Sequence, residues 1–147
     1  MELRQINLGC GKQHKEGFLN VDMQKPADLV VDVTKEHPFE DDFYDRIDAD
    51  NVVEHFDNDE FLFVMNNMHD ALKSGGLFWI KTPDALNWMD GAFGDPTHKR
   101  FFVPRSWNYL DITHQTWKEY GSAYGFKGWY VNVFTDKRFF ICELTKP

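Results

Sequence analysis

A short predicted strand followed by a glycine turn, near the start of the chain, constrains the fold more than any other stretch. Apolar and polar residues alternate over residues 5–8, and Gly9 and Gly11 then interrupt the pattern. Glycine in such a turn lets the backbone pass close to a ligand, where a β-carbon would clash. A second predicted strand over residues 18–22 ends in Asp22, and an acid at that place in nucleotide-binding α/β folds holds ribose hydroxyls. This order of features predicts a nucleoside-binding site.

Further strands and one helix follow in an order typical of α/β proteins. We predict strands at residues 28–33, 46–49 and 77–81. The run of Val and Leu in the first of them is typical of a strand buried on both faces of a parallel sheet. Asp57 and Glu60 have the spacing of a capping box, which predicts a helix that begins there and ends at Gly75-Gly76. Its apolar residues recur at helical spacing and are expected to pack in the core: Phe61, Met65, Met68 and Leu72.

The remainder of the chain favours a single domain. Residues 85–128 are rich in Trp, Phe, Tyr, Gly and Asp, and a helix is expected to begin at Pro104. Residues 129–145 have the pattern of an antiparallel hairpin. We therefore expect one domain over residues 1–147, with an α/β core at residues 5–84, an aromatic substrate or lid segment, and a C-terminal hairpin.

Charge is spread unevenly along the chain, whose formal net charge is −8. Residues 1–60 contain 16 acids and 6 Lys/Arg, whereas residues 61–147 contain 8 acids and 10 Lys/Arg. An acidic first half disfavours nucleic acid as a partner and favours a cationic small molecule. A solvated acidic surface that keeps the protein soluble is an equally good interpretation for most of these carboxylates.

Cysteine usage and hydropathy indicate a cytoplasmic protein. Cys10 and Cys142 lie at opposite ends of the chain, one in the glycine turn and one in an apolar strand. Such a pair favours a reducing compartment over a disulfide. No apolar run approaches the length of a membrane span, and the N-terminus lacks the pattern of a signal peptide.

Six short stretches, taken together and in order, resemble class I S-adenosylmethionine-dependent methyltransferases. They are Asn7–Gly11, Asn20–Asp22, Asp32, Pro38–Asp41, Val52–His55 and Leu72–Gly76. The resemblance covers residues 5–84. Residues 95–102, followed by a helix, resemble a segment found after the fifth strand in some bacterial and phage members.

The resemblance implies a Rossmann-like sheet of seven strands, six parallel and one antiparallel, with the C-terminal hairpin supplying the reversed strand. The segments after Gly11, Asp22 and Asp32 leave little room for the usual crossover helices, and Met1 lies only a few residues before the first strand. We therefore expect a minimal form of the fold with reduced crossover helices and no N-terminal substrate cap. A thinly covered sheet with many aromatic residues predicts a partner surface, and we expect a homodimer.

The resemblance also implies S-adenosylmethionine as the cofactor. Gly9 and Gly11 would let the backbone pass under its methionine part, and Asp22 would hold its ribose hydroxyls. Asp32 and Val33 would lie by the adenine, and the pair that follows the fourth strand would face the transferable methyl group. The residues expected to bind the cofactor are Gly9, Cys10, Gly11, Asp22, Met23, Asp32, Val33, Asp50 and Asn51.

Two histidines are candidate catalytic bases, because histidine titrates near neutral pH. His55 follows Glu54 at the start of the predicted helix, and His98 is expected to face the open side of the cofactor. Some family members bind a divalent metal through a Glu-x-x-Glu-His element. Asn51 stands at its first position here and is a poor substitute for a carboxylate, so we expect no metal and a local capping role for Glu54 and His55.

The acceptor is expected to be a small molecule that carries an anionic group. Lys99, Arg100 and Arg105 form a basic cluster that could receive a phosphate or carboxylate, and a solvated loop is an equally good interpretation. Aromatic residues of the same segment could wall an acceptor pocket, although most of so large a set packs in cores. They are Trp88, Phe93, Phe101, Phe102, Trp107 and Tyr109.

Three other functions compete with that of a small-molecule methyltransferase. A nucleic-acid or protein methyltransferase is one, and the lack of a basic face argues against nucleic acid. A protein that binds S-adenosylmethionine without turnover, as a regulatory or assembly subunit, is another. A nicotinamide-dependent dehydrogenase fits poorly, because His14 stands where its third glycine is expected.

Overall fold

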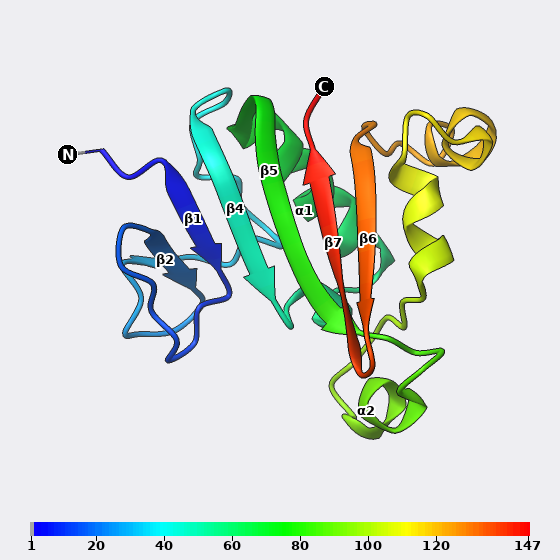
Figure 1. The fold of residues 1–147 in the computed structure, drawn as a ribbon. Coiled ribbons are helices and arrows are strands. Elements are labelled where there is room, and N and C mark those ends of the chain that lie inside the picture. The colour runs from blue at the N-terminus through cyan, green and yellow to red at the C-terminus, as the bar shows by residue number, and fades with distance from the viewer. Residues whose placement is uncertain (1) are drawn as a thin grey trace.

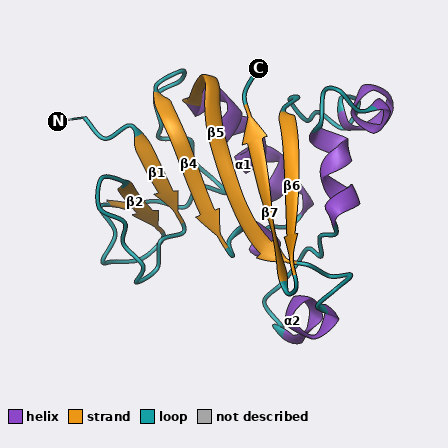
Figure 2. Ribbon diagram, viewed as in Figure 1, coloured by secondary structure: helices purple, strands orange, loops and turns teal. Residues whose placement is uncertain are grey.

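The computed structural model describes residues 2–147 and shows one mixed sheet with a long helix packed against it (Figures 1 and 2). The strands are β1 (Gln5–Leu8), β2 (Leu19–Asp22), β3 (Leu29–Val30), β4 (Tyr44–Asp50), β5 (Leu72–Pro83), β6 (Tyr130–Asp136) and β7 (Phe139–Thr145). The helices are α1 (Asn58–Ala71) and α2 (Met89–Gly94), the 3₁₀ turns η1 (Val53–His55) and η2 (Pro104–Leu110), and the π-helical turn η3 (Trp117–Gly121). None of these helices combines the length and apolar character that a membrane crossing requires.

The strand order across the sheet is β3-β2-β1-β4-β5-β7-β6. The first five strands in this order pair in parallel, while β7 pairs antiparallel with both β5 and β6. β7 is therefore the one reversed strand of seven, and the C-terminal hairpin supplies it as expected. Asp136 pairs with Phe139, so Lys137 and Arg138 form the hairpin turn, with Lys137 at a φ of 36°.

The hydrophobic core lies between the sheet and α1, which Figure 1 shows behind the strands. Asp57 caps α1 with the predicted capping box, because its carboxylate accepts the Glu60 N–H and the Glu60 carboxylate accepts the Asp57 N–H. Phe61, Met65 and Met68 of the predicted apolar stripe are buried in this helix as expected, whereas Leu72 lies beyond its end. Alternate residues of the central strands meet it, among them Ile6, Leu8, Ile47, Ala49, Phe78 and Ile80.

The predicted strand over residues 28–33 is wrong in extent and in burial. Only Leu29 and Val30 pair with β2, and β3 is an edge strand whose Val30 is 48% exposed. The chain leaves the sheet at Asp32, where Thr34 turns back to hydrogen-bond the Asp32 carboxylate. The apolar residues after β3 therefore line a cavity instead of filling the interior of a sheet.

The predicted end of the long helix at Gly75-Gly76 is also wrong. α1 ends at Ala71, and Leu72 already pairs with Tyr44 of β4 as the first residue of β5. Gly75 has a φ of 80° and donates its N–H to the carbonyl of Lys146, so the two glycines bend β5 next to the end of the chain.

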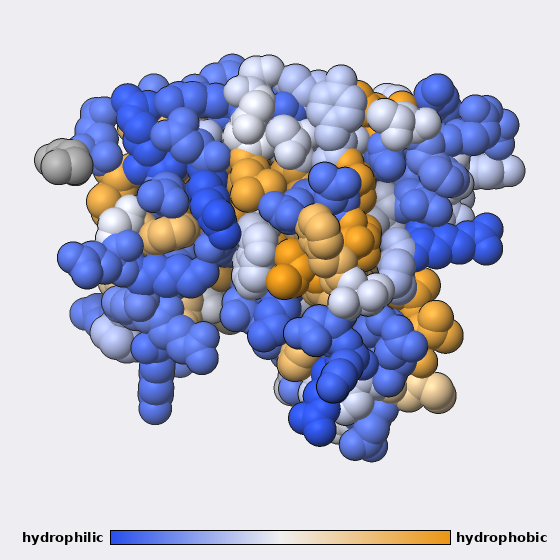
Figure 3. Space-filling model, viewed as in Figure 1, coloured by the Kyte–Doolittle hydropathy of each residue, from blue (hydrophilic) through white to orange (hydrophobic). Residues whose placement is uncertain are grey.

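The other face of the sheet is thinly covered, as expected. Within residues 2–147 no helix lies between β1 and β2, between β2 and β3, or between β3 and β4. The side chains on this face alternate with the buried ones along β5, β7 and β6, and include Leu77, Trp79, Ile141 and Phe134. Figure 3 shows an apolar patch at the centre of this face.

Candidate functional site

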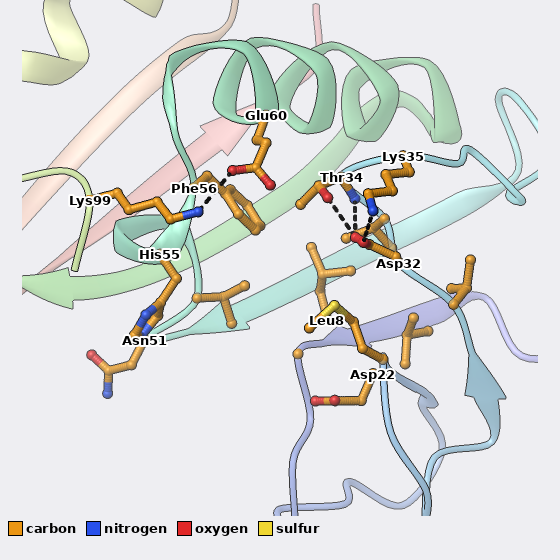
Figure 4. A pocket seen from close by; sticks show the side chains of 16 residues that line it. Leu8, Asp22, Asp32, Thr34, Lys35, Asn51, His55, Phe56, Glu60 and Lys99 are labelled. Atoms are coloured by element: carbon orange, nitrogen blue, oxygen red, sulfur yellow. Dashed lines mark hydrogen bonds and ion pairs between the residues drawn. The ribbon is translucent and has the colours of Figure 1, made fainter. Parts of the chain in front are cut away.

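A cavity of about 490 Å³ opens at the carboxyl ends of the parallel strands, and we call it the strand-end cavity (Figure 4). Parallel strands end at the same edge of a sheet, so turns that are distant in sequence meet there. Six of the nine residues predicted to bind the cofactor line it: Gly9, Asp22, Met23, Asp32, Val33 and Asn51. Cys10, Gly11 and Asp50 are not among its lining residues, and Cys10 is 4% exposed.

The glycine turn after β1 needs both of its glycines. Gly9 has a φ of 66°, and a β-carbon there would lie 2.6 Å from Cγ2 of Val52. Gly11 has a φ of 51° and open space where its side chain would be. The turn therefore brings the backbone against Val52 at the rim of the cavity, which any larger residue at position 9 would prevent.

Asp22 is held against this turn at the end of β2. Its Oδ2 accepts the N–H of Gly11 at 2.9 Å, and its Oδ1 accepts the N–H of Gln24 at 3.2 Å. An ionised carboxylate has about four acceptor sites. Both oxygens therefore keep capacity for a ligand hydroxyl while the backbone fixes their position.

Asp32 and Asn51 face the cavity from the turns after β3 and β4. Asp32 Oδ1 accepts both the N–H and the hydroxyl of Thr34, at 3.0 and 2.6 Å, and Oδ2 lies 3.9 Å from Nζ of Lys35. Asn51 has a φ of 55° and donates its N–H to the carbonyl of Lys81. The left-handed conformation at Asn51 is one that Asn tolerates better than most residues.

Sequence reasoning did not assign eight further lining residues to this site. They are Leu8, Val21, Val31, Thr34, Lys35, Val52, Phe56 and Glu60. Thr34 carried a usable signal, because Asp-x-Thr is typical of a turn in which the Asp side chain accepts from the residue two positions on. Glu60 was assigned only to helix capping, but its side chain caps the helix and also lines the cavity. Its Oε1 accepts the Asp57 N–H and lies 3.4 Å from Nζ of Lys99.

The structure brings Glu54, His55 and His98 together next to the cavity. One ligand atom from each lies within 4.8 Å of the others, and the two imidazole rings are 4.9 Å apart between centroids. The carbonyl of Glu54 accepts the N–H groups of Lys99 and Arg100, and these two bonds hold the distant segment against η1. His55 lines the strand-end cavity, whereas the side chain of His98 is 7% exposed and lies behind it, not facing the open side as expected.

Hydrogen bonds set the orientation of both imidazoles. Nδ1 of His98 lies 2.7 Å from the carbonyl of Ala92, and Nδ1 of His55 lies 3.3 Å from that of Thr97. Nδ1 of His55 also lies 3.2 Å from Oγ1 of Thr97, and Nε2 of His98 lies 3.6 Å from Oδ2 of Asp95. Two imidazoles beside a carboxylate form a set that could hold a divalent cation or move a proton.

Glu54 is the buried acid of this cluster, only 2% exposed. Its Oε2 accepts the hydroxyl of Thr82 at 3.0 Å, while Oε1 is buried without a partner among the residues described. Burial raises the pKa of Glu54 from its usual 4.5 to about 7, against the opposing effect of its hydrogen bonds and of His98. Near neutral pH this carboxyl can therefore hold or release a proton.

A second cavity, of about 380 Å³, adjoins the first, and we call it the aromatic cavity. Lys99 lines both cavities, while Arg100 lines only the aromatic one and the exposed Arg105 lines neither. Four of the six aromatics proposed for an acceptor pocket line it: Phe101, Phe102, Trp107 and Tyr109. Trp88 and Phe93 pack elsewhere, against Phe139 and Phe101 respectively.

Comparison with solved structures shows which fold this is. The chain superposes on an S-adenosylmethionine-dependent methyltransferase from Archaeoglobus fulgidus with a TM-score of 0.69 and 15% identity, covering 97% of this chain and 86% of that one. A 1,6-didemethyltoxoflavin N1-methyltransferase from Burkholderia thailandensis, solved with bound 1,6-didemethyltoxoflavin and S-adenosylhomocysteine, superposes with a TM-score of 0.63 and 12% identity, covering 97% of this chain and 70% of that one. The methyltransferase domain of bacterial CtHen1 superposes with a TM-score of 0.61 and 13% identity, covering 97% of this chain and 90% of that one.

The sequence matches no protein-family model and no curated protein. At identities this low, structural similarity establishes the fold alone. That fold is the class I methyltransferase fold.

Proposed function

We propose that this chain, which has the class I methyltransferase fold, binds S-adenosylmethionine and transfers its methyl group to a small molecule. The observation that carries the proposal is the strand-end cavity, where Gly9, Asp22, Asp32 and Asn51 converge from four different strands. Ligands of open α/β sheets bind at this edge, outside the carboxyl ends of the strands.

The residues of the cavity fit this cofactor. Gly9 lets the turn lie directly against Val52 in the cavity wall, where the methionine part would bind, and the anchored Asp22 carboxylate can accept the ribose hydroxyls. Asp32 and Val33 would hold the adenine, and Asn51 would lie towards the methyl group. Cys10, Gly11 and Asp50 would support these residues from behind.

The chain contributes alignment and a base. S-adenosylmethionine supplies a methyl group on a positively charged sulfur, which an aligned nucleophile displaces in line. His55 lines the cavity with Nε2 available, so we propose that it accepts the proton of an acceptor that must lose one. His98, which lies behind His55, would receive or relay that proton, with Glu54 beside it.

Calorimetric titration with S-adenosylmethionine and S-adenosylhomocysteine tests the proposal. Wild-type protein should bind both, and Asp22→Ala should weaken binding by roughly tenfold or more, because hydrogen bonds to a charged group contribute about 1.5–3 kcal/mol. Asp45→Ala is the matched control, since it removes an exposed carboxylate that pairs with Lys73 outside the cavity. Equal affinity of the two variants would show that Asp22 does not hold the cofactor.

A protein that binds the cofactor without turnover is the second candidate, and the reduced crossover helices of residues 2–147 are compatible with it. Incubation with labelled S-adenosylmethionine and a panel of anionic metabolites distinguishes the two. A methylated product supports the enzyme, whereas tight binding without any product supports a regulatory or assembly subunit.

We also propose a homodimer in the cytoplasm. The thinly covered sheet face carries apolar side chains together with charges of both signs, such as Lys81 and Glu143, and could pair with a second copy. Cys10 and Cys142 are both free and buried, which agrees with a reducing compartment. Sedimentation that finds a monomer at high concentration would exclude the dimer.

A further inference from the structure

The aromatic cavity contains two cations, and within residues 2–147 only one of them, Lys99, forms an ion pair. Its volume of about 380 Å³ lies within the range of small-ligand sites. None of its lining residues is acidic, and two of them, Lys99 and Arg100, are cationic. Rings form most of the remaining wall, including Phe61, Phe102, Trp107, Tyr109, Tyr124 and Phe126.

Arg100 is the central group of this cavity. Its guanidinium carbon lies 4.4 Å from the centre of the Phe61 ring and 5.7 Å from that of Phe102. Within residues 2–147 its one side-chain hydrogen bond runs from Nη1 to Oδ1 of Asn58, at 2.6 Å, and Nε is buried without a partner. Burial lowers the pKa of Arg100, and Asp57 only partly opposes this.

An unpaired, partly buried guanidinium is costly unless an anion joins it. The stacking of Arg100 on Phe61 fixes the plane of its nitrogens, and such a fork matches a carboxylate or phosphate in two parallel hydrogen bonds. Lys99 adds a second cation to the wall. The cavity therefore offers two cations and several ring faces and has no acidic lining residue, which favours an anion that carries a flat ring.

The aromatic cavity also adjoins the strand-end cavity, so a ligand bound in it would lie next to a cofactor bound in the strand-end cavity. Lys99 lines both, and its Nζ lies 3.4 Å from Oε1 of Glu60, as Figure 4 shows. The two side chains are 54% and 25% exposed. A pair this exposed contributes little to stability, so a ligand can displace it at little cost.

We infer that the aromatic cavity is the acceptor site and that it takes a planar aromatic acid, whose anionic group pairs with Arg100 while its ring stacks on the aromatic wall. The assignment of this ligand as an acceptor rests on the function proposed above. The ligand class itself rests on the cavity alone.

Binding of model acids to the full chain tests this inference. Calorimetry would compare 4-hydroxybenzoate and phenyl phosphate with the neutral 4-hydroxybenzamide and with cyclohexanecarboxylate, which lacks the flat ring. We expect the two aromatic acids to bind roughly tenfold more tightly than the amide, which cannot form the charged pair with Arg100, and severalfold more tightly than cyclohexanecarboxylate, which cannot stack on the rings. Equal affinity for acid and amide, or no binding of any compound, would overturn the inference.

Two matched pairs of variants locate the site. Arg100→Gln should lose the preference for acids, whereas Arg105→Gln, which changes an exposed neighbour outside the cavity, should keep it. Tyr124→Ala should weaken all aromatic ligands severalfold, whereas Tyr120→Ala should not. Both tyrosines are more than half exposed, at 57% and 51%, so neither change threatens the fold. Identical behaviour within each pair would place the site elsewhere.

The affinity for S-adenosylmethionine, measured on the same samples, separates this inference from the proposed function. If the cofactor binds through Asp22 and the aromatic acids do not bind through Arg100, only the present inference fails. If the acids bind through Arg100 and the cofactor does not bind, the ligand class stands and the proposed function fails.

Discussion

The two cavities that meet at Lys99 are built in different ways. The strand-end cavity is lined by turns that directly follow neighbouring strands, and nearly all of its residues lie between positions 8 and 60. The aromatic cavity is lined by the first turn of α1 and by residues 99–126, which no strand pairing brings together. Asp22 and Asp32 line the first, whereas no carboxylate is among the described residues that line the second. A site at strand ends thus follows from local sequence, whereas a site between packed segments depends on tertiary contacts.

The largest effect on the free energy of unfolding is expected from a substitution in the wall of the strand-end cavity. Gly9→Val places a branched side chain at a φ of 66° and against Val52, so strain and overpacking should together cost about 4 kcal/mol of unfolding free energy. Thermal and urea unfolding measure the loss. Gly94→Ala is the control, because no atom lies within 4 Å of its β-carbon position. Near-wild-type stability of Gly9→Val would contradict the close approach to Val52.

The pH dependence of stability tests Glu54, which fixes the wall shared by the two cavities. The pKa of Glu54 is about 7 in the folded protein, against an ordinary value of 4.5. Between pH 4.5 and 7 the folded state therefore keeps a proton on Glu54 that the unfolded state has lost. The free energy of unfolding should therefore fall as pH rises from 4.5 to 7, by up to about 3 kcal/mol. Urea unfolding at several pH values in the presence of a chelator measures this slope.

Glu54→Gln is the comparison variant for that measurement. It cannot ionise, so the part of the slope that belongs to Glu54 should disappear and the variant should gain stability relative to wild type above pH 7. An unchanged slope in the variant would mean that Glu54 does not hold the proton.

The smallest effect on stability is expected at the contact between the cavities. Lys99→Met removes the exposed pair with Glu60 and should change the free energy of unfolding by less than about 1 kcal/mol. The same variant should weaken the binding of 4-hydroxybenzoate severalfold, because one of two cations near that ligand is lost. Lys35→Met removes a lysine that lines only the strand-end cavity and should leave this binding unchanged. Similar effects of both variants would mean that Lys99 does not face the aromatic cavity.

The parts of the fold that depend on short-range patterns were predicted from the sequence. The strand and glycine turn at Gln5–Gly11, the capping box at Asp57 and the final hairpin each have a local chemical cause, and all three were found. The errors occurred where long-range pairing overrode local preference. Leu72 joins β5 because Tyr44 pairs with it, although its spacing continues the helical stripe. The valines after β3 look like strand residues but line a cavity.

By itself, the sequence determined the order of strands and turns, and with it the gathering of Gly9, Asp22, Asp32 and Asn51 at one edge. Parallel strands bring their carboxyl ends together whatever the rest of the chain does. Only the tertiary structure decided that His98 lies against His55, that Arg100 is left without an anion, and that Lys99 separates two cavities. These depend on the hydrogen bonds from Lys99 and Arg100 to the carbonyl of Glu54, about 45 residues earlier. Backbone groups make those bonds, and because every residue carries them, the sequence gives no sign of the pairing.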